Sequence, residues 1–416
     1  MTGDRGQSLA GRWIVVGTLC FVCLLNYADR QAVFSVFPLL KSELRLSDVQ
    51  LGVVGASFMW VYALFGPFAG WLCDRFARKT LIIGALLFWS FATAVSALSH
   101  TYAELIVCRA LTGFGEAAYL PASMSLISDY HGSSTRSRAM SVHQSSVYVG
   151  TVLGGGLSGW VAEHYGWRAS FLLFGALGVL LGAALLKLLR EPERGQCDRD
   201  VIQTTRVTAQ GPGLWAGIRE VFGKPYVLLL IAAFIGANFV AVVFLSWMPS
   251  FLYRKFHMSL SSAGFNATVY LQLASVLGVL SGGFLADTLT KRKPKPGNGR
   301  ILTQSIGLLC GVPFLFLIGY ARTLPILLIS LLVFGYCKGI YDSNIFASLY
   351  DFVSVEYRGV AAGLLNSLGW LGGGTAPVLI AVVSLHYGMR ASMSGTAAIY
   401  LAIGVMLFFA ARRAAA

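Results

Sequence analysis

The sequence predicts an all-α membrane protein whose twelve transmembrane helices form two pseudo-symmetric six-helix bundles. Three observations predict this fold class. Of the 416 residues, 56% are hydrophobic and 12% are charged, whereas soluble domains carry roughly 25% charged residues. A dozen apolar runs are long enough to cross a hydrocarbon layer roughly 30 Å thick. The motif at 164–170 recurs at 386–392, which indicates that one half of the chain is a copy of the other.

The apolar runs are interpreted as transmembrane helices in chain order. The first run is followed by eleven more and lacks a small-residue cleavage site, so we do not interpret it as a removable signal peptide. The 47 glycines suit helices that approach each other closely in a bilayer. We expect the spans near 13–38, 49–72, 79–99, 102–128, 138–162, 168–189, 225–252, 262–289, 301–320, 324–350, 358–385 and 389–411.

The positive charges alternate from loop to loop. The net charge is +14, and groups of Arg and Lys follow the second, sixth and eighth spans, while the intervening loops hold far fewer cations. This positive-inside pattern predicts that both termini are cytoplasmic, in a plasma membrane such as the inner membrane of a bacterium. The basic excess therefore reflects topology, and we expect the lipid bilayer as a partner rather than nucleic acid.

A polar stretch divides the chain into halves that resemble each other. We expect a first bundle at 1–189, a cytoplasmic linker at 190–224 and a second bundle at 225–416. "HYGWRAS" at 164–170 returns as "HYGMRAS" at 386–392, a shift of 222 residues. The same shift pairs Gly113 with Gly335, Tyr119 with Tyr341, Asp129 with Asp351, Arg136 with Arg358 and Glu116 with Lys338. Internal duplication is typical of transporters, whose substrate sites lie near the bilayer midplane between the repeats.

The first span holds an acid and a base side by side, Asp29 and Arg30. An unpaired charge at this depth costs at least about 2.5 to 3.5 kcal/mol, so such residues face a bundle interior or a water-filled cavity. Tyr27 and Arg30 are three residues apart and share a helix face, whereas Asp29 points roughly 100° away. The alternative is a structural pair in which Asp29 and Arg30 neutralise each other.

The fourth span supplies a second set of charges. Arg109 and Glu116 are two turns apart and project from one face, with Tyr119 about one turn further on. Arg109 offers a cation for an anion, and Glu116 offers a carboxyl that can take up a proton when it is desolvated. A static bridge between Arg109 and Glu116 is the alternative, although about 10.5 Å of helical rise separates them.

Other polar residues of the membrane region extend this site. Lys338 brings a cation from the second half, accompanied by Tyr341, but Asp342 is four residues further on and the two can form a structural pair. His143 can relay protons, or can pack with a hydrogen bond inside the bundle. Asn366 is a polar residue that can line the site.

Motifs for other chemistry are missing from the sequence. It contains no Walker loop, HExxH or GxSxG, which disfavours ATP-driven transport. An intramembrane enzyme needs a convergent nucleophile, base or metal set, and a receptor leaves the membrane charges of both halves unexplained. Cys20 and Cys23 are interpreted as packing residues because no His or acidic co-ligands lie nearby. We therefore expect no enzyme activity, no catalytic residues, no metal and no cofactor.

Several motifs resemble the major facilitator superfamily. "GWLCDRFARK" at 70–79 fits the family signature G-x-x-x-D-R-x-x-R-K, and "GGFLADTLTKR" at 282–292 is a degenerate copy. "NYADR" in the first span, "SFMWVYALFGPFAGWLCDR" in the second and "RALTGFGEAAYLPASMSLISDY" in the fourth are similar to the branch that contains the organic anion:cation symporters and the spinster-like transporters.

This resemblance implies a fold, a function and residue roles. Two six-helix bundles rock about a central site, where Asp29 and Glu116 carry coupling protons. The substrate-binding residues that it implies are Tyr27, Arg30, Tyr62 and Arg109. Gly70, Asp74 and Arg75, with Asp287 in the degenerate copy, would latch the cytoplasmic side.

The function predicted from the sequence is proton-coupled symport of a small organic anion, a sugar acid or another carboxylate, by a protein that we expect to be monomeric. The alternative is a spinster-like carrier of a lysolipid or another amphipathic lipid. That alternative predicts a lateral opening to the bilayer and an apolar lining around the charges.

Overall fold

The fold is described from a computed structural model, which describes residues 9–132, 135–192, 214–292 and 298–413. The first half contains α1 (Leu9–Ser35), α2 (Phe37–Glu43), α3 (Asp48–Arg75), α4 (Arg78–Ser96), α5 (Tyr102–Glu116), α6 (Tyr119–Tyr130), α7 (Arg136–Tyr165) and α8 (Trp167–Leu188). The second half follows α10 (Leu214–Phe222) and contains α11 (Pro225–Phe256), α12 (Leu260–Arg292), α13 (Asn298–Tyr320), α14 (Leu324–Asp342), α15 (Ile345–Phe352), a short 3-10 turn (Val355–Tyr357), α16 (Arg358–Gly395) and α17 (Ala397–Arg413).

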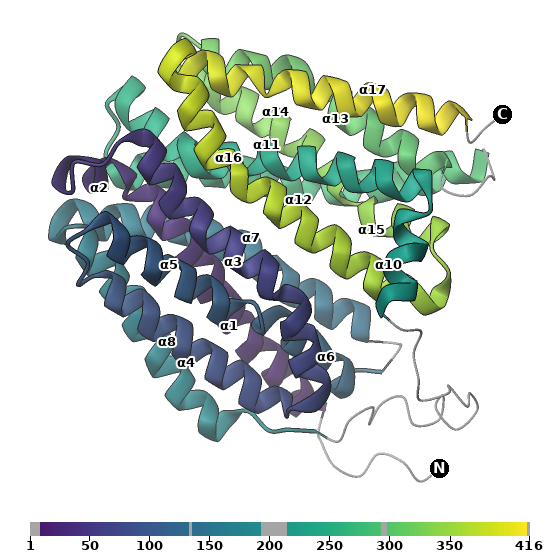
Figure 1. The fold of residues 1–416 in the computed structure, drawn as a ribbon, viewed down its shortest axis with the longest axis horizontal. Coiled ribbons are helices and arrows are strands. Elements are labelled where there is room, and N and C mark those ends of the chain that lie inside the picture. Colours follow the sequence, from purple (N-terminus) through teal and green to yellow (C-terminus); the bar gives the residue numbers. More distant parts are fainter. Residues whose placement is uncertain (1–8, 133–134, 193–213, 293–297, 414–416) are drawn as a thin grey trace.

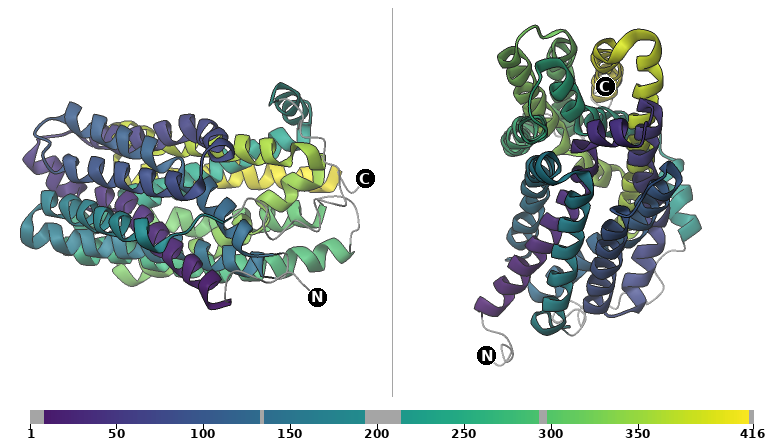
Figure 2. Two further views of the ribbon diagram at one scale, coloured as in Figure 1. Left: turned by 90° about the horizontal axis from the view of Figure 1, so that it is seen from below. Right: turned by 90° about the vertical axis from the view of Figure 1, so that its left-hand side faces the viewer.

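These helices form twelve spans, as the sequence predicted. Nine described segments are long and apolar enough to cross a membrane, and one of them, Arg358–Arg412, contains the last two spans. The fourth span is divided into α5 and α6, and the tenth into α14 and α15. Figures 1 and 2 show the two halves as separate groups of helices that splay apart on one side, where the first group ends at the start of α1 and the second at the end of α17. We call this the termini end, and the opposite end the far end.

The turns of the duplicated motif have the same backbone conformation. Gly166 lies between α7 and α8 with φ 83°, and Gly388 has φ 75° where α16 is interrupted. A residue with a side chain is strained at such angles, whereas glycine is not. The interruption at Gly388 separates the eleventh span from the twelfth, at the position that the sequence predicted.

An ion pair of the first half recurs in the second half at residue numbers 222 higher. Arg78 Nη1 lies 2.9 Å from Asp129 Oδ2, at the start of α4 and near the end of α6. In the second half, Arg300 pairs with Asp351 at the corresponding places in α13 and α15. Both partners are displaced by 222 residues, so the duplication inferred from the sequence is also present in the tertiary contacts.

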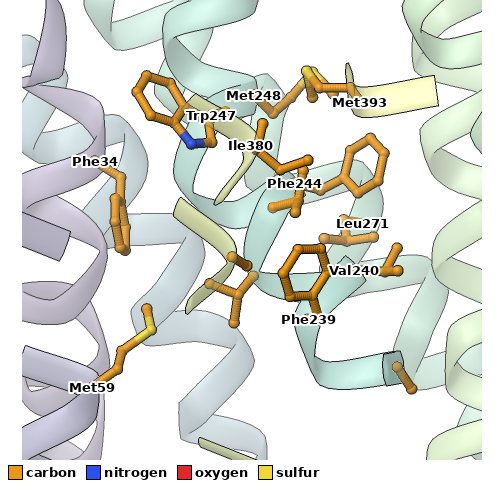
Figure 3. Close-up of a cluster of buried hydrophobic side chains, with 14 of the residues drawn as sticks. Phe34, Met59, Phe239, Val240, Phe244, Trp247, Met248, Leu271, Ile380 and Met393 are labelled. Atoms are coloured by element: carbon orange, nitrogen blue, oxygen red, sulfur yellow. The ribbon is translucent and has the colours of Figure 1, made fainter. Parts of the chain in front are cut away.

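The two bundles meet toward the far end. There α7 packs on α12 so closely that a β-carbon on Gly264 would come within 2.0 Å of the Gly155 carbonyl oxygen. The α3 helix packs on α16 in the same region. Figure 3 shows the buried apolar side chains here, with Phe34 and Met59 from the first half facing Trp247 and Ile380 from the second.

The bundles diverge toward the termini end (Figure 1). Gly70, near the end of α3, and Gly283, near the end of α12, would each accept a β-carbon with no other atom within 4 Å. The latch expected at Gly70 is therefore not closed in this conformation, since no neighbouring helix among the described residues approaches Gly70 closely. The site described next lies between the contact at the far end and this divergence.

Candidate functional site

Arg30 of α1 pairs with Glu116, the last residue of α5. Arg30 Nε donates a hydrogen bond to Glu116 Oε2 over 2.5 Å. The side chains are 10% and 0% exposed, respectively. Glu116 lies where the fourth span breaks, since the next helix, α6, begins at Tyr119. The break brings the carboxylate to the middle of the span, opposite α1.

Asp29 turns to other partners. Its Oδ2 accepts a hydrogen bond from Thr93 Oγ1 over 2.5 Å, and its Oδ1 lies 3.8 Å from Arg109 Nη1. Asp29 and Arg109 are 4% and 1% exposed. The neighbouring residues of α1 thus pair with two residues of α5 that lie two turns apart. Among the described residues, no ion pair joins Asp29 with Arg30 or Arg109 with Glu116, so both alternatives considered for these residues are replaced by a crossed arrangement.

This set of four charges has unused hydrogen-bonding capacity. Within the described protein, Arg30 Nη1, Arg109 Nε and Arg109 Nη1 have no hydrogen-bond partner, and neither do Asp29 Oδ1 and Glu116 Oε1. Unpartnered buried polar atoms are costly and occur at few places in a protein. Guanidinium groups bind carboxylates well, and each free carboxylate oxygen can accept a proton.

Four aromatic rings surround the Arg30 guanidinium. The distances from its central carbon to the ring centroids are 4.5 Å for Tyr62, 4.7 Å for Tyr27, 5.0 Å for Phe58 and 5.6 Å for Trp370. Cation–π attraction of this kind holds a cation without neutralising it. Trp370 belongs to α16, so the second bundle completes the cage around a residue of the first. We refer to these four rings as the aromatic cage.

Phe58 and Trp370 were missed by the sequence reasoning. Phe58 is one turn from Tyr62 on α3, and its ring also lies 4.9 Å from the Arg109 guanidinium. The turn spacing is the signal that could have identified Phe58. Asn366 is half-buried and lies one turn before Trp370 on α16, so it shares the helix face that carries the cage residue.

Lys338 forms an ion pair with Asp342 on the same helix. The two side chains are 17% and 29% exposed, and Tyr148 of α7 lies within electrostatic range of both. Lys338 is therefore neutralised in this conformation, at a position where the two bundles face each other.

The structure places Tyr119, His143 and Tyr341 away from the crossed charges. The Tyr119 hydroxyl donates to the Leu19 carbonyl oxygen over 2.8 Å and lies 2.8 Å from His143 Nε2. Tyr119 and His143 are almost completely buried within the first bundle. Tyr341 is equally buried in the second bundle. These three residues pack inside their own bundles, so substrate contact by the tyrosines would require a different conformation.

The gating candidates lie at the termini end. The Arg75 guanidinium lies 4.2 Å from the Trp71 ring centroid, and Asp287 is exposed. The side chain of Asp74 lies outside the described residues. The sequence did not identify Glu191, whose carboxylate accepts hydrogen bonds from the backbone N–H groups of Arg78 and Lys79 at the start of α4.

Comparisons with known proteins agree with this architecture. The chain is 27% identical over 406 residues to the probable galactarate/D-glucarate transporter of Bacillus subtilis, covering 91% of this chain and 87% of that one. It is 28% identical to the chloroplastic ascorbate transporter of Arabidopsis thaliana, covering 89% and 70%. It is 25% identical to the hexuronate transporter of Bacillus subtilis, covering 92% of each chain.

A solved structure with the same fold is the crystal structure of a bacterial homolog to the human lysosomal transporter Spinster, in an inward-facing and unoccupied conformation. The TM-score is 0.85 at 23% identity, with 98% of each chain covered. The family model described as Major Facilitator Superfamily matches residues 19–311 of this chain. With twelve helices in two bundles and a match over more than half its length, this chain belongs to the Major Facilitator Superfamily and is a multi-pass membrane transporter, not an enzyme.

Proposed function

We propose that the chain is a proton-coupled symporter of a small organic anion, such as a sugar acid or another carboxylate, and that it works by alternating access. The observation that carries the proposal is the crossed pairing of Asp29 with Arg109 and of Arg30 with Glu116, with free donors on both arginines. Similarity to transporters named for galactarate, D-glucarate and hexuronate supports the substrate class.

Protonation of the acids frees the arginines for substrate. A proton on Glu116 removes the negative charge that holds Arg30, and a proton on Asp29 does the same for Arg109. The guanidinium groups can then bind a substrate carboxylate, while Tyr27 and Tyr62 hold the Arg30 guanidinium in place. Release of the anion lets the arginines pair with the acids again, and the protons then leave.

The second bundle contributes the remaining contacts. We propose that Asn366 and Trp370 bind the uncharged part of the substrate and that Lys338 adds a cation when it leaves Asp342. The bundles at 1–189 and 225–416, joined by the linker at 190–224, would then move as the two halves of a monomer. Substrate bound between them couples the halves to each other.

We place the termini end in the cytoplasm, because the loops there carry most of the cations, and the protein in a plasma membrane such as the bacterial inner membrane. In this orientation the far end is closed to the outside. Gly70, Asp74, Arg75 and Asp287 lie where the bundles must approach each other when the cytoplasmic side closes. Gly70 has the free space that such an approach requires.

A lipid carrier is the second candidate. An apolar groove of about 220 Å³ lies between α3, α4 and the break in the fourth span, lined by Phe65, Phe68, Phe88 and Phe114 among others. It could admit an acyl chain from the bilayer. The unpartnered donors on Arg30 and Arg109 favour a compact anion instead.

The test is uptake into proteoliposomes under an imposed inward proton gradient. A pool of D-glucarate, D-galactarate, a hexuronate and a lysolipid is offered, and the accumulated species are identified by mass spectrometry. Each unit of pH difference supports about tenfold accumulation per coupled proton. We expect a sugar acid to accumulate in the parent protein and in Glu163→Gln, which removes an exposed acid at the end of α7.

In Glu116→Gln only the proton on Asp29 is left, so we expect the sugar acid to accumulate about tenfold less per unit of pH difference than in the parent protein. Accumulation that does not depend on the gradient, or that is as high in Glu116→Gln as in the parent protein, contradicts proton coupling through Glu116. Uptake of the lysolipid alone would establish the second candidate.

A further inference from the structure

A pocket of about 410 Å³ lies at the far end, remote from the crossed charges. The last turns of α11 and the interruption of α16 at Gly388 form it. Its volume is within the range of small-molecule sites. No residue that lines this pocket has a role in the transport mechanism proposed above.

Three cations line the pocket, namely Arg254, Lys255 and Arg390, and the lining includes no acid. Lys255 Nζ donates to the Gly319 carbonyl oxygen over 3.1 Å, and Arg390 lies close enough to repel it. Within the described part of the chain, neither Lys255 nor Arg390 forms an ion pair. Converging like charges without an acid favour the binding of an anion. Trp247 and Tyr387 add aromatic surface.

Arg254 also belongs to a contact between the bundles. Its Nη2 lies 3.1 Å from Asp48 Oδ1, at the start of α3. Among the ion pairs of the described residues, the Arg254–Asp48 pair is the one whose partners come from different bundles. Asp48 has a second partner, since Lys41 of its own bundle donates to the same Oδ1 over 2.7 Å. If Arg254 moves away, Asp48 remains paired.

We propose that this pocket binds an anion from the far side of the membrane, through its carboxylate or phosphate group, and that the bound anion competes with Asp48 for Arg254. Occupation gives Lys255 and Arg390 a counter-charge and weakens the ion pair between the bundles at their closed end. An anion arriving there promotes the opening of that end. The ligand is a small carboxylate from solution or the phosphate head group of an outer-leaflet lipid. This site is separate from the proposed central site and does not require it.

Binding is measured in an Arg30→Gln background, so that failure of the central site does not affect the result. The first ligand is D-glucarate, titrated into delipidated protein by calorimetry. The second is phosphatidylglycerol, whose retention is measured by native mass spectrometry. The test variant is Lys255→Gln/Arg390→Gln, and the matched control is Arg45→Gln/Arg322→Gln, which removes two exposed cations outside the pocket lining.

We expect one of the two ligands to bind at least tenfold more weakly to the test variant and unchanged to the control. If D-glucarate is the ligand that binds more weakly to the test variant, the pocket is a solute site. If the test variant retains less phosphatidylglycerol, the pocket is a lipid site. Unchanged binding of both ligands to the test variant overturns the proposal.

Competition with Asp48 has its own test. Asp48→Asn should tighten binding of the same ligand several-fold, because Arg254 no longer has a competing acid. Glu43→Gln is the control, since it removes another acid at the far end that pairs with Arg168. Equal effects of the two substitutions, or no tightening in Asp48→Asn, contradict the competition.

Discussion

Arg30 is held in two ways, by the Glu116 carboxylate at one edge and by the aromatic cage around its plane. A planar guanidinium can make both kinds of contact, while a lysine ammonium cannot reproduce this geometry. The cage allows Arg30 to keep its position when Glu116 is protonated. Binding of substrate then does not have to order a mobile side chain.

The first prediction concerns Trp370, the cage residue from the second bundle. Trp370→Ala removes a cation–π contact worth about 0.5 to 2 kcal/mol, so we expect KM for the transported anion to rise about 2- to 30-fold. Trp370→Phe should raise KM much less than Trp370→Ala does, because an aromatic ring remains beside Arg30. Trp160→Ala, at an exposed tryptophan of α7, is the control. A parent-like KM in Trp370→Ala would show that the cage does not support binding.

The sequence identified the charged residues but not their pairing. Helix periodicity shows which residues of one helix share a face, so it grouped Tyr27 with Arg30 and Arg109 with Glu116. It does not show which residues of another helix lie opposite, and the crossed pairs follow from the contact of α1 with α5. Trp370 was missed because an aromatic ring in an apolar helix has the same sequence signal whether it faces lipid or a cation, and Phe58 was missed although it lies one turn from Tyr62.

At the scale of elements, the twelve spans were predicted because hydrophobic length is set by the bilayer. The break in the fourth span was not predicted. Pro121 lies in the first turn of α6, and its ring would clash with the carbonyl of Ala117 in a continuous helix. Pro121 was therefore the signal for a break that begins immediately after Glu116.

The second prediction concerns the turns at Gly166 and Gly388. A β-carbon at either position meets no atom within 4 Å, so an alanine is disfavoured only by the positive φ. The two glycines have φ 83° and 75° and ψ 159° and 156°, a region that residues with a side chain rarely adopt, so we expect Gly166→Ala and Gly388→Ala each to reduce the free energy of unfolding by about 1 to 3 kcal/mol, seen as similar drops in the melting midpoint. Gly395→Ala, in equally open space without a positive φ, should cause no drop. Unequal effects at the two turns would mean that the repeats differ there.

For the whole molecule, the third prediction uses the divergence of the bundles at the termini end. A β-carbon at Gly70 meets no atom within 4 Å in this conformation, so we expect Gly70→Leu to keep the parent melting midpoint. It should lower the maximal transport rate severalfold, because the side chain obstructs closure of that end. Gly84→Leu, at another open position, is the matched control. Equal rates for the two variants would contradict a gating role of Gly70.

The crossed charges of Asp29, Arg30, Arg109 and Glu116 also determine the net charge that the central site carries across the membrane. Two guanidinium groups and two carboxylates sum to zero, so the empty carrier can reorient without moving charge through the membrane field. A dianion that enters with two protons leaves this sum at zero. We therefore expect transport of D-glucarate to be independent of a potential clamped with valinomycin and potassium. Asp29→Asn leaves the empty carrier with one positive charge, so its turnover should become electrogenic.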